Sequence, residues 1–242
     1  MERPRLIVLG PSHYCERARW ALDHAGIAYD EIRWAPALHI PQARRLAPQS
    51  FVPILVTGAA VIQGSDRILD WLGTAGGVAD VEHRVSETVA PLVRRYLYSA
   101  TLHDARSGIS DVLLDGVQPL QARAGKWLWP VIRRLMAMKM DIDPALLPEL
   151  EGRIESELAW FGDIVANCDH LAGDCLGRAD ITAASLLAPL LRGPAVVPMY
   201  DRVRLPDDAE RALARWNQTP ALRWVRRLYQ SHRHQSSATR SR

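Results

Sequence analysis

Ser12 and Cys15 lie in the turn after the first apolar run of the chain, which reads GPSHYCER from Gly10 to Arg17. The spacing predicts Ser12 at the N-cap of a helix and Cys15 one turn inside it. A helix N-terminus gathers unpaired N–H groups and the positive end of the helix dipole, so it favours an anion such as a thiolate. Either Cys15 is that anion, or Ser12 donates to one on a ligand. A plain cap beside a small buried cysteine fits the same residues.

A second set of residues that could bind a ligand lies between positions 52 and 65. Pro53 stands directly before an expected strand, and a cis Val52–Pro53 bond would leave the Val52 backbone free to pair with an extended ligand. A trans proline at a strand start is the alternative. Further on, Gly64-Ser65 opens a helix, where the Ser65 hydroxyl and nearby N–H groups suit a carboxylate. By itself that serine is only a helix cap.

The elements that position these residues change in character near residue 77. Apolar spacing up to that point predicts the order β-α-β-α-β-β-α, with a parallel crossover at its start. Beyond it no strand pattern is convincing, and the apolar residues recur at helical spacing. We therefore expect an α/β domain over residues 1–77, an all-helical domain over 84–230 and a disordered tail over 231–242.

Composition excludes several classes of protein. The 242 residues carry 30 Lys and Arg against 27 Asp and Glu, and three of the arginines lie in the last twelve residues, so the rest of the chain is neutral and nucleic-acid binding has little electrostatic support. No apolar run of about 20 residues is present, which argues against a membrane span. The N-terminus is unlike a signal peptide, and three cysteines do not suit a disulfide scaffold. We expect a cytoplasmic protein with neither nucleic acid nor membrane as a partner.

Taken together, these features resemble the cytosolic glutathione transferase superfamily, with a serine-type N-terminal domain similar to the omega and tau classes. The resemblance rests on the element order, Ser12, Val52-Pro53, Ser65 and the helical second part. The segment Gly173–Asp180, GDCLGRAD, also resembles the family's capping motif Gly-Asp-x-x-Ser/Thr-x-Ala-Asp. The family implies a thioredoxin-like glutathione-binding domain over residues 1–77, a helical domain over 84–230 and a homodimer.

The resemblance also implies a role for each residue of the site. Ser12 would donate a hydrogen bond to the sulfur of glutathione, which serves as co-substrate without a metal. Val52 would pair with the cysteinyl part, Pro53 would be cis, and Gly64-Ser65 would hold the γ-glutamyl carboxylate. The thiolate would then attack a small-molecule electrophile or a mixed disulfide. Four aromatic residues lie in helices that border the electrophile pocket in this family, namely Tyr96, Tyr98, Trp127 and Trp129.

Three departures from the family pattern keep rival functions open. Gly64 stands where an acid or glutamine is usual, His13 replaces a proline, and Gly177 replaces the capping serine or threonine. Gly64 and His13 favour a non-catalytic interaction protein on the same fold, similar to stringent starvation protein A. Ser12, Val52-Pro53 and Ser65 together favour the enzyme. Thiol transfer through Cys15 is a third hypothesis. A metal site is not expected, because the spacing of the nearest candidate ligands is unusual; these are Cys168, His170 and Cys175.

Overall fold

The computed structural model describes residues 3–193 and 197–233. Its first part is a four-stranded sheet in the order β2-β1-β3-β4, in which β1 pairs parallel with β2 and antiparallel with β3. This arrangement confirms the predicted β-α-β-α-β-β-α order. The elements are β1 (Arg5–Val8), α1 (His13–His24), β2 (Asp30–Arg33), α2 (Ile40–Leu46), β3 (Ile54–Val56), β4 (Val61–Gln63) and α3 (Ser65–Trp71).

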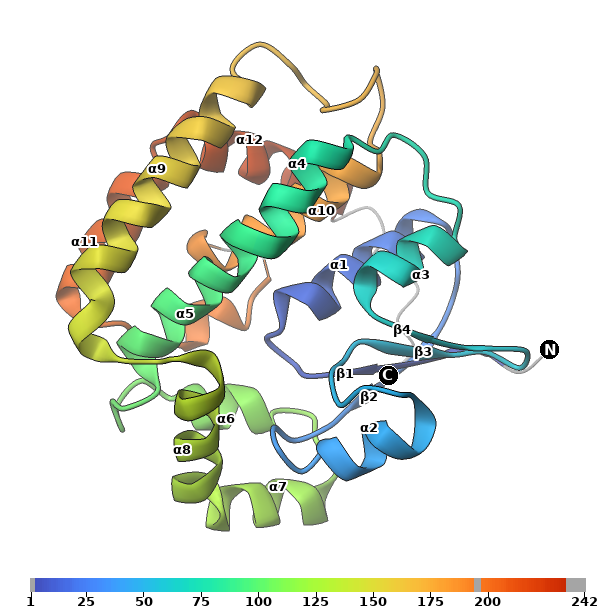
Figure 1. Cartoon of the computed structure of the whole chain (residues 1–242), viewed down its shortest axis with the longest axis vertical. Coiled ribbons are helices and arrows are strands. Elements are labelled where there is room, and N and C mark those ends of the chain that lie inside the picture. The colour runs from blue at the N-terminus through green and yellow to red at the C-terminus, as the bar shows by residue number, and fades with distance from the viewer. Residues whose placement is uncertain (1–2, 194–196, 234–242) are drawn as a thin grey trace.

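The described residues of the second part form helices joined by loops and no strand, as predicted, apart from an isolated bridge between Arg33 and Val117. One continuous helical stretch, α4 to α5, runs beside the long α9 (Figure 1). The elements are α4 (Ala79–Arg84), η1 (Val85–Val89), α5 (Ala90–Thr101), α6 (Ile109–Leu114), α7 (Pro119–Trp127), α8 (Trp129–Met140), η2 (Pro144–Leu146), α9 (Leu147–Val165), α10 (Arg178–Leu187), η3 (Ala188–Leu190), η4 (Tyr200–Arg202), α11 (Asp207–Trp216), α12 (Pro220–Leu228) and η5 (Tyr229–Arg233).

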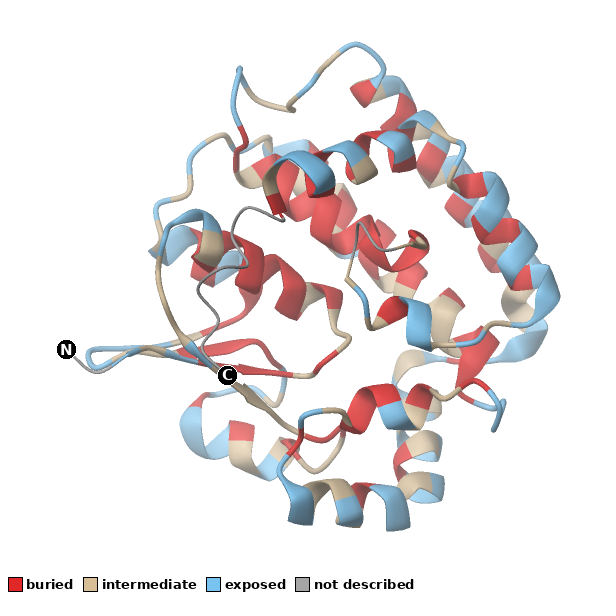
Figure 2. Cartoon of the chain, turned by 180° about the vertical axis from the view of Figure 1, so that it is seen from behind, coloured by how far each residue is buried: buried red, intermediate tan, exposed pale blue. Residues whose placement is uncertain are grey.

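Helix α1 is buried on two sides and joins the two parts of the molecule. Cys15 and Leu22 pack into the apolar cluster beside the sheet, whereas Trp20 and Ala21 pack into the helical core. The helix contacts α3 and α10, and buried residues fill this central region in Figure 2. Because α1 is fixed from both sides, the turn at its N-terminus is held in a defined position.

The capping motif at the start of α10 explains the glycine at position 177. Asp180 accepts hydrogen bonds from the backbone N–H groups of Gly177 and Leu171, both at 2.8 Å. A Cβ at residue 177 would lie 3.0 Å from the Gly76 Cα, because the linker between the two parts crosses here. The Ala75 carbonyl accepts from Arg178 N–H at 2.7 Å. The linker backbone thus caps α10 where a side-chain hydroxyl would collide with it.

The C-terminal end differs from the sequence prediction. Residues 231–233 were expected in a disordered tail, yet they belong to η5, and Arg233 is buried. Its guanidinium forms ion pairs with Glu16, at 2.8 Å, and with Asp23. Two buried carboxylates on α1 therefore hold the chain end in place. The rest of the predicted tail, 234–242, lies outside the described residues.

Candidate functional site

Ser12 is the N-cap of α1, as the sequence predicts. Its backbone is extended, with φ −71° and ψ 122°, and its Oγ accepts a hydrogen bond from the Cys15 N–H at 3.4 Å. The side chain is half-buried. Since Oγ is the acceptor in this bond, the hydroxyl hydrogen stays available for a second partner. Ser12 therefore has the geometry to donate to an anion at the helix terminus.

Cys15 is an unfavourable nucleophile in this structure. It is 0% exposed and packs in the cluster beside the sheet. Burial raises the pKa of its thiol, and the nearby Arg19 charge and the Ser12 hydrogen bond offset only part of that effect. A protonated, inaccessible thiol has neither the charge nor the access that thiol transfer requires. The placement of Cys15 is that of a small core residue.

The Val52–Pro53 peptide bond is cis, as the resemblance implies. Among the residues that the structure describes, no hydrogen bond reaches the N–H or C=O of Val52. The preceding loop is held by Gln63, whose amide donates to the carbonyls of Gln49 at 2.9 Å and Phe51 at 2.8 Å. Gln63 is thus committed to the loop, and the Val52 backbone remains free to pair with a ligand.

Ser65 begins α3 and lies against a buried arginine that the sequence analysis did not single out. Arg17 Nε donates to Ser65 Oγ at 2.8 Å, and its Nη1 donates to Ser86 Oγ at 3.0 Å. Arg17 forms no ion pair with any described residue, and burial lowers the pKa of its guanidinium. Ser65 itself is only 2% exposed. An arginine in a helix is ordinarily solvated, so the sequence gives little signal for this contact.

The glycine at position 64 has an acid beside it after all. A Cβ added to Gly64 would lie only 2.7 Å from Oδ1 of Asp66, so the Asp66 carboxylate fills the space of a side chain at position 64. Gly64 also has φ 103°, a conformation that favours glycine. Asp66 therefore brings a carboxylate next to position 64, where the sequence itself has no acidic residue.

His13 is buried beside two cationic side chains. Burial, followed by the charges of Arg94 and Arg17, lowers the pKa of His13 to about 3. Its Nε2 has no hydrogen-bond partner among the described residues, and its ring meets the Tyr14 ring edge to face at 4.6 Å. His13 is consequently neutral at physiological pH and cannot act there as a protonated acid.

The four predicted pocket aromatics lie in different surroundings. Tyr96 is in the core, where its hydroxyl donates to Glu151 at 3.0 Å and its ring packs on Trp216. Trp127 is 82% exposed on α7, and Trp129 lines a cavity of about 160 Å³ with Arg133 and several residues between positions 102 and 110. Burial raises the pKa of Tyr98 to about 12. Tyr96 is thus a core residue and Trp127 a surface residue, and the electrophile pocket stays a prediction.

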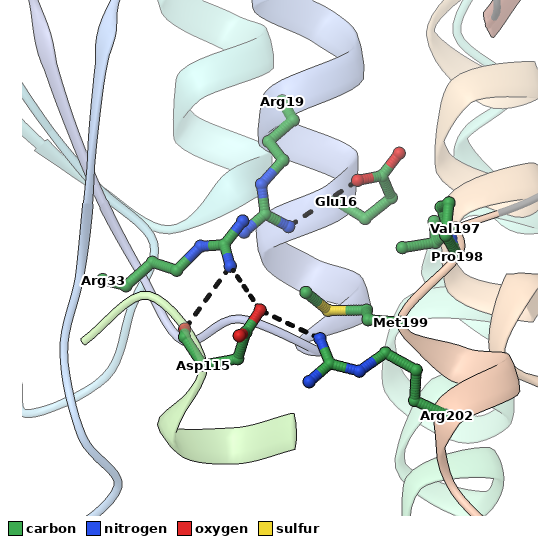
Figure 3. A pocket seen from close by; sticks show the side chains of 8 residues that line it. All are labelled: Glu16, Arg19, Arg33, Asp115, Val197, Pro198, Met199 and Arg202. Carbon is green, nitrogen blue, oxygen red and sulfur yellow. Dashed lines mark hydrogen bonds and ion pairs between the residues drawn. The ribbon is translucent and has the colours of Figure 1, made fainter. Parts of the chain in front are cut away.

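A cavity of about 240 Å³ lies between α1, β2 and the loop before η4 (Figure 3). Its charged side chains pair with one another: Arg33 with Asp115 at 3.2 Å, and Arg202 with Asp115 at 3.1 Å. Met199 lines it and lies 3.6 Å from the position of a Cβ on Gly10. Each charged side chain that lines the cavity already forms an ion pair, so the described residues offer no unpaired charge to a ligand there. Within 3–193 and 197–233 no cluster of three or more His, Cys, Asp or Glu side chains is arranged to hold a metal ion.

Comparison with known proteins agrees with this architecture. Residues 6–77 match the family described as glutathione S-transferase, N-terminal domain. None of the curated proteins matches the sequence. A solved glutathione transferase from Phanerochaete chrysosporium shares 15% identity with a TM-score of 0.64, and the match covers 100% of this chain and 99% of the other. The N-terminal part of the chain therefore resembles the N-terminal domain of glutathione S-transferases.

Two more solved structures extend the likeness in fold over most of the chain. The theta class glutathione S-transferase from Xanthomonas axonopodis pv. citri, solved with glutathione bound, is 19% identical, with a TM-score of 0.57 and coverage of 93% of this chain and 98% of the other. A beta-etherase from Sphingobium sp. strain SYK-6 is 16% identical, with a TM-score of 0.55 and the same coverage. At such identities, these matches establish the fold alone.

Proposed function

We propose that the protein is a glutathione-dependent transferase in which Ser12 donates a hydrogen bond to the sulfur of bound glutathione. The observation that carries the proposal is the half-buried Ser12 hydroxyl at the first turn of α1, with its hydrogen available. The superfamily of the N-terminal domain and the glutathione bound to the theta class relative support the choice of ligand.

The proposed contacts are sufficient to hold the thiol as its anion. Lowering a thiol pKa from about 8.5 to about 6.5 requires roughly 2.7 kcal/mol of preference for the thiolate. A charge-assisted hydrogen bond contributes about 1.5 to 3 kcal/mol, and a helix terminus adds about 0.3 to 1 kcal/mol. The thiolate then attacks the electrophilic carbon, a C–S bond forms, and the leaving group departs with its electron pair.

The rest of the tripeptide would lie along Val52 and the start of α3. In this proposal the free N–H and C=O of Val52 pair with the cysteinyl residue, next to cis Pro53. The γ-glutamyl carboxylate meets Gly64 and Ser65, behind which Arg17 places a positive charge. Asp66, in the space beside Gly64, binds the amino group of the same residue. Arg17 acts here as a positioning residue, because it holds the Ser65 hydroxyl.

One observation favours the rival function, an interaction protein that does not turn over glutathione. Ser65 and Arg17 are almost fully buried, so the carboxylate end of the site is less open than the Ser12 end. A protein that uses this fold only to hold a partner needs no access to these side chains. Binding of glutathione therefore separates the two functions.

Replacement of Ser12 tests the transferase directly. Ser12→Ala is expected to lower kcat/KM towards an activated aryl halide roughly ten- to hundred-fold, since it removes a hydrogen bond of about 1.5 to 3 kcal/mol to the thiolate. Cys15→Ala is the matched control on the same helix and is expected to keep the activity of the wild type. Full activity of Ser12→Ala would contradict the proposed role of Ser12, and loss of activity in Cys15→Ala alone would assign the chemistry to the cysteine.

A further inference from the structure

Helices α7 and α8 expose large apolar side chains at one end of the molecule. Leu120, Trp127 and Met138 are 80%, 82% and 72% exposed. Val131, Leu135 and Met138 recur at i, i+4 and i+7, so they form one stripe along α8. Figure 1 places α7 and α8 at one end of the longest axis. A cluster of exposed apolar side chains of this kind is typical of a surface that binds a protein or a membrane.

The charged residues of α7 and α8 themselves are all basic. Residues 116–140 contain Arg123, Lys126, Arg133, Arg134 and Lys139 and no acid. Among the described residues, only Lys126 of these five forms an ion pair, with Asp111 at 3.1 Å. Arg134 lies between Val131 and Leu135 in sequence and within the same stripe, so positive charge and apolar surface are interleaved.

Helix α2 continues the same surface. The Gln121 amide on α7 donates to Gln42 Oε1 on α2 at 3.3 Å, so the two helices are neighbours. Exposed Arg44 and Arg45 lie on α2 beside half-exposed Leu46, and residues 34–65 contain no acid. The segments 34–65 and 116–140 together hold seven of the 30 basic residues and none of the 27 acidic ones, leaving 23 basic against 27 acidic residues elsewhere.

We propose that this α2–α7–α8 surface docks onto an anionic lipid bilayer. Exposed Trp and Leu side chains suit the boundary between headgroups and acyl chains, while interleaved Lys and Arg suit anionic headgroups. The sequence predicted no membrane partner because no segment is long enough to span, and in the described part of the chain no helix can cross a membrane. Attachment to a bilayer surface requires no such helix.

Charge distinguishes a bilayer from a second copy of this chain. Two copies that met face to face through this surface would bring fourteen basic residues together, if the seven are counted in each, and among the described ion pairs only Asp111 of each copy offsets one of them. That arrangement is unfavourable, because like charges repel at contact distance. An anionic bilayer instead neutralises the same residues and accommodates the protruding side chains of α7 and α8, since it is fluid.

Co-sedimentation with vesicles tests the proposal on the full chain. Vesicles of phosphatidylcholine with phosphatidylglycerol at low salt should bind the protein at least tenfold more tightly than phosphatidylcholine alone, and added salt should weaken binding. Trp127→Ser and Arg134→Glu should each reduce binding about tenfold. The controls on α3, Trp71→Ser and Arg67→Glu, make the same substitutions at exposed positions away from this surface and should leave vesicle binding unchanged.

Two outcomes would overturn the proposal. The first is the absence of sedimentation with anionic vesicles, or equal losses in the α7–α8 variants and the α3 controls. The second concerns the oligomeric state: if light scattering shows that Trp127→Ser converts a dimer to a single chain while the wild type ignores vesicles, the surface is an interface between copies. All four substitutions are at exposed positions, and circular dichroism checks that each variant folds.

Discussion

Arg17 and Arg19 lie two residues apart on α1 and are both buried, yet their charges are balanced differently. Arg19 donates to Glu31 at 2.6 Å and lies 3.6 Å from Glu16. Arg17 contacts the hydroxyls of Ser65 and Ser86. Because acids already neutralise Arg19, its role is structural. The charge of Arg17 is the one that can still act on a carboxylate that binds near Ser65.

The carboxylate of Glu31 makes the free energy of unfolding depend on pH. Burial alone would raise its pKa, but Arg19 and Arg33 lower it from 4.5 to about 2. The carboxylate therefore stabilises the folded chain by about 3 kcal/mol above pH 4.5, and this contribution disappears as the pH falls towards 2. Glu31→Gln should lower the free energy of unfolding by about 2 to 4 kcal/mol at neutral pH and flatten its decline in acid.

Denaturant unfolding over a pH series measures this effect. Asp30→Asn is the neighbouring control, because Asp30 forms an exposed pair with Arg3 and exposed pairs contribute at most about 1 kcal/mol. If the free energy of unfolding depends on pH in the same way for the wild type and Glu31→Gln, the ion pairs of Glu31 do not contribute this stability.

At the scale of elements, the junction between the linker and α10 joins the two domains. The Ala75 and Gly76 carbonyls accept from the N–H groups of Arg178 and Ala179 at 2.7 and 3.1 Å. Arg178 also pairs with Asp70 on α3 and Glu82 on α4. The absence of a side chain at Gly177 is what allows these contacts. Backbone contacts between the domains therefore stand at the position where the family's motif has a capping hydroxyl.

Gly177→Ala tests that exchange. Its Cβ would press on the Gly76 backbone at 3.0 Å, and we expect a loss of about 1 to 3 kcal/mol in the free energy of unfolding. Gly152→Ala, in α9, is the control, because its Cβ meets nothing within 4 Å and should stabilise the helix by about 0.5 to 1 kcal/mol. If both variants are equally stable, the close approach at Gly177 does not constrain the sequence.

Regular apolar spacing was sufficient to predict most of these elements. The predicted helix at 150–165 is α9 with one turn more, and Thr219 is the N-cap of α12, as expected from Thr219-Pro220. The contacts of Arg17 and Asp66 were not predictable, because they depend on where long side chains point across two elements. For the same reason the sequence could not show that Tyr96 lies in the core, because its position in the helix is compatible with a pocket as well.

At the scale of the whole molecule, one chain of alternating charges connects distant segments. It runs through Asp23, Arg233, Glu16, Arg19, Glu31, Arg33, Asp115 and Arg202. It thereby joins η5, α1, β2, the end of α6 and η4. The sequence suggested a solvated tail at Arg233 because its partners Glu16 and Asp23 lie 217 and 210 residues earlier. The predicted homodimer remains a prediction.

Removal of Arg233 tests the contribution of this network. Arg233→Ala leaves the buried carboxylates of Glu16 and Asp23 without their shared cation, and breaking a buried pair costs about 3 to 5 kcal/mol. Arg202→Ala, at the exposed end of the network, should cost about 1 kcal/mol or less. Urea unfolding of both variants is the measurement, and equal losses would mean that the chain end is not anchored through Arg233.

Isothermal titration with glutathione tests the central claim most directly. We predict a saturable heat that fits one site per chain in the millimolar range or below, and Ser65→Ala should weaken the affinity about tenfold through its lost contact with the carboxylate. Wild-type protein that gives no heat at several millimolar glutathione would contradict the account and favour the interaction protein.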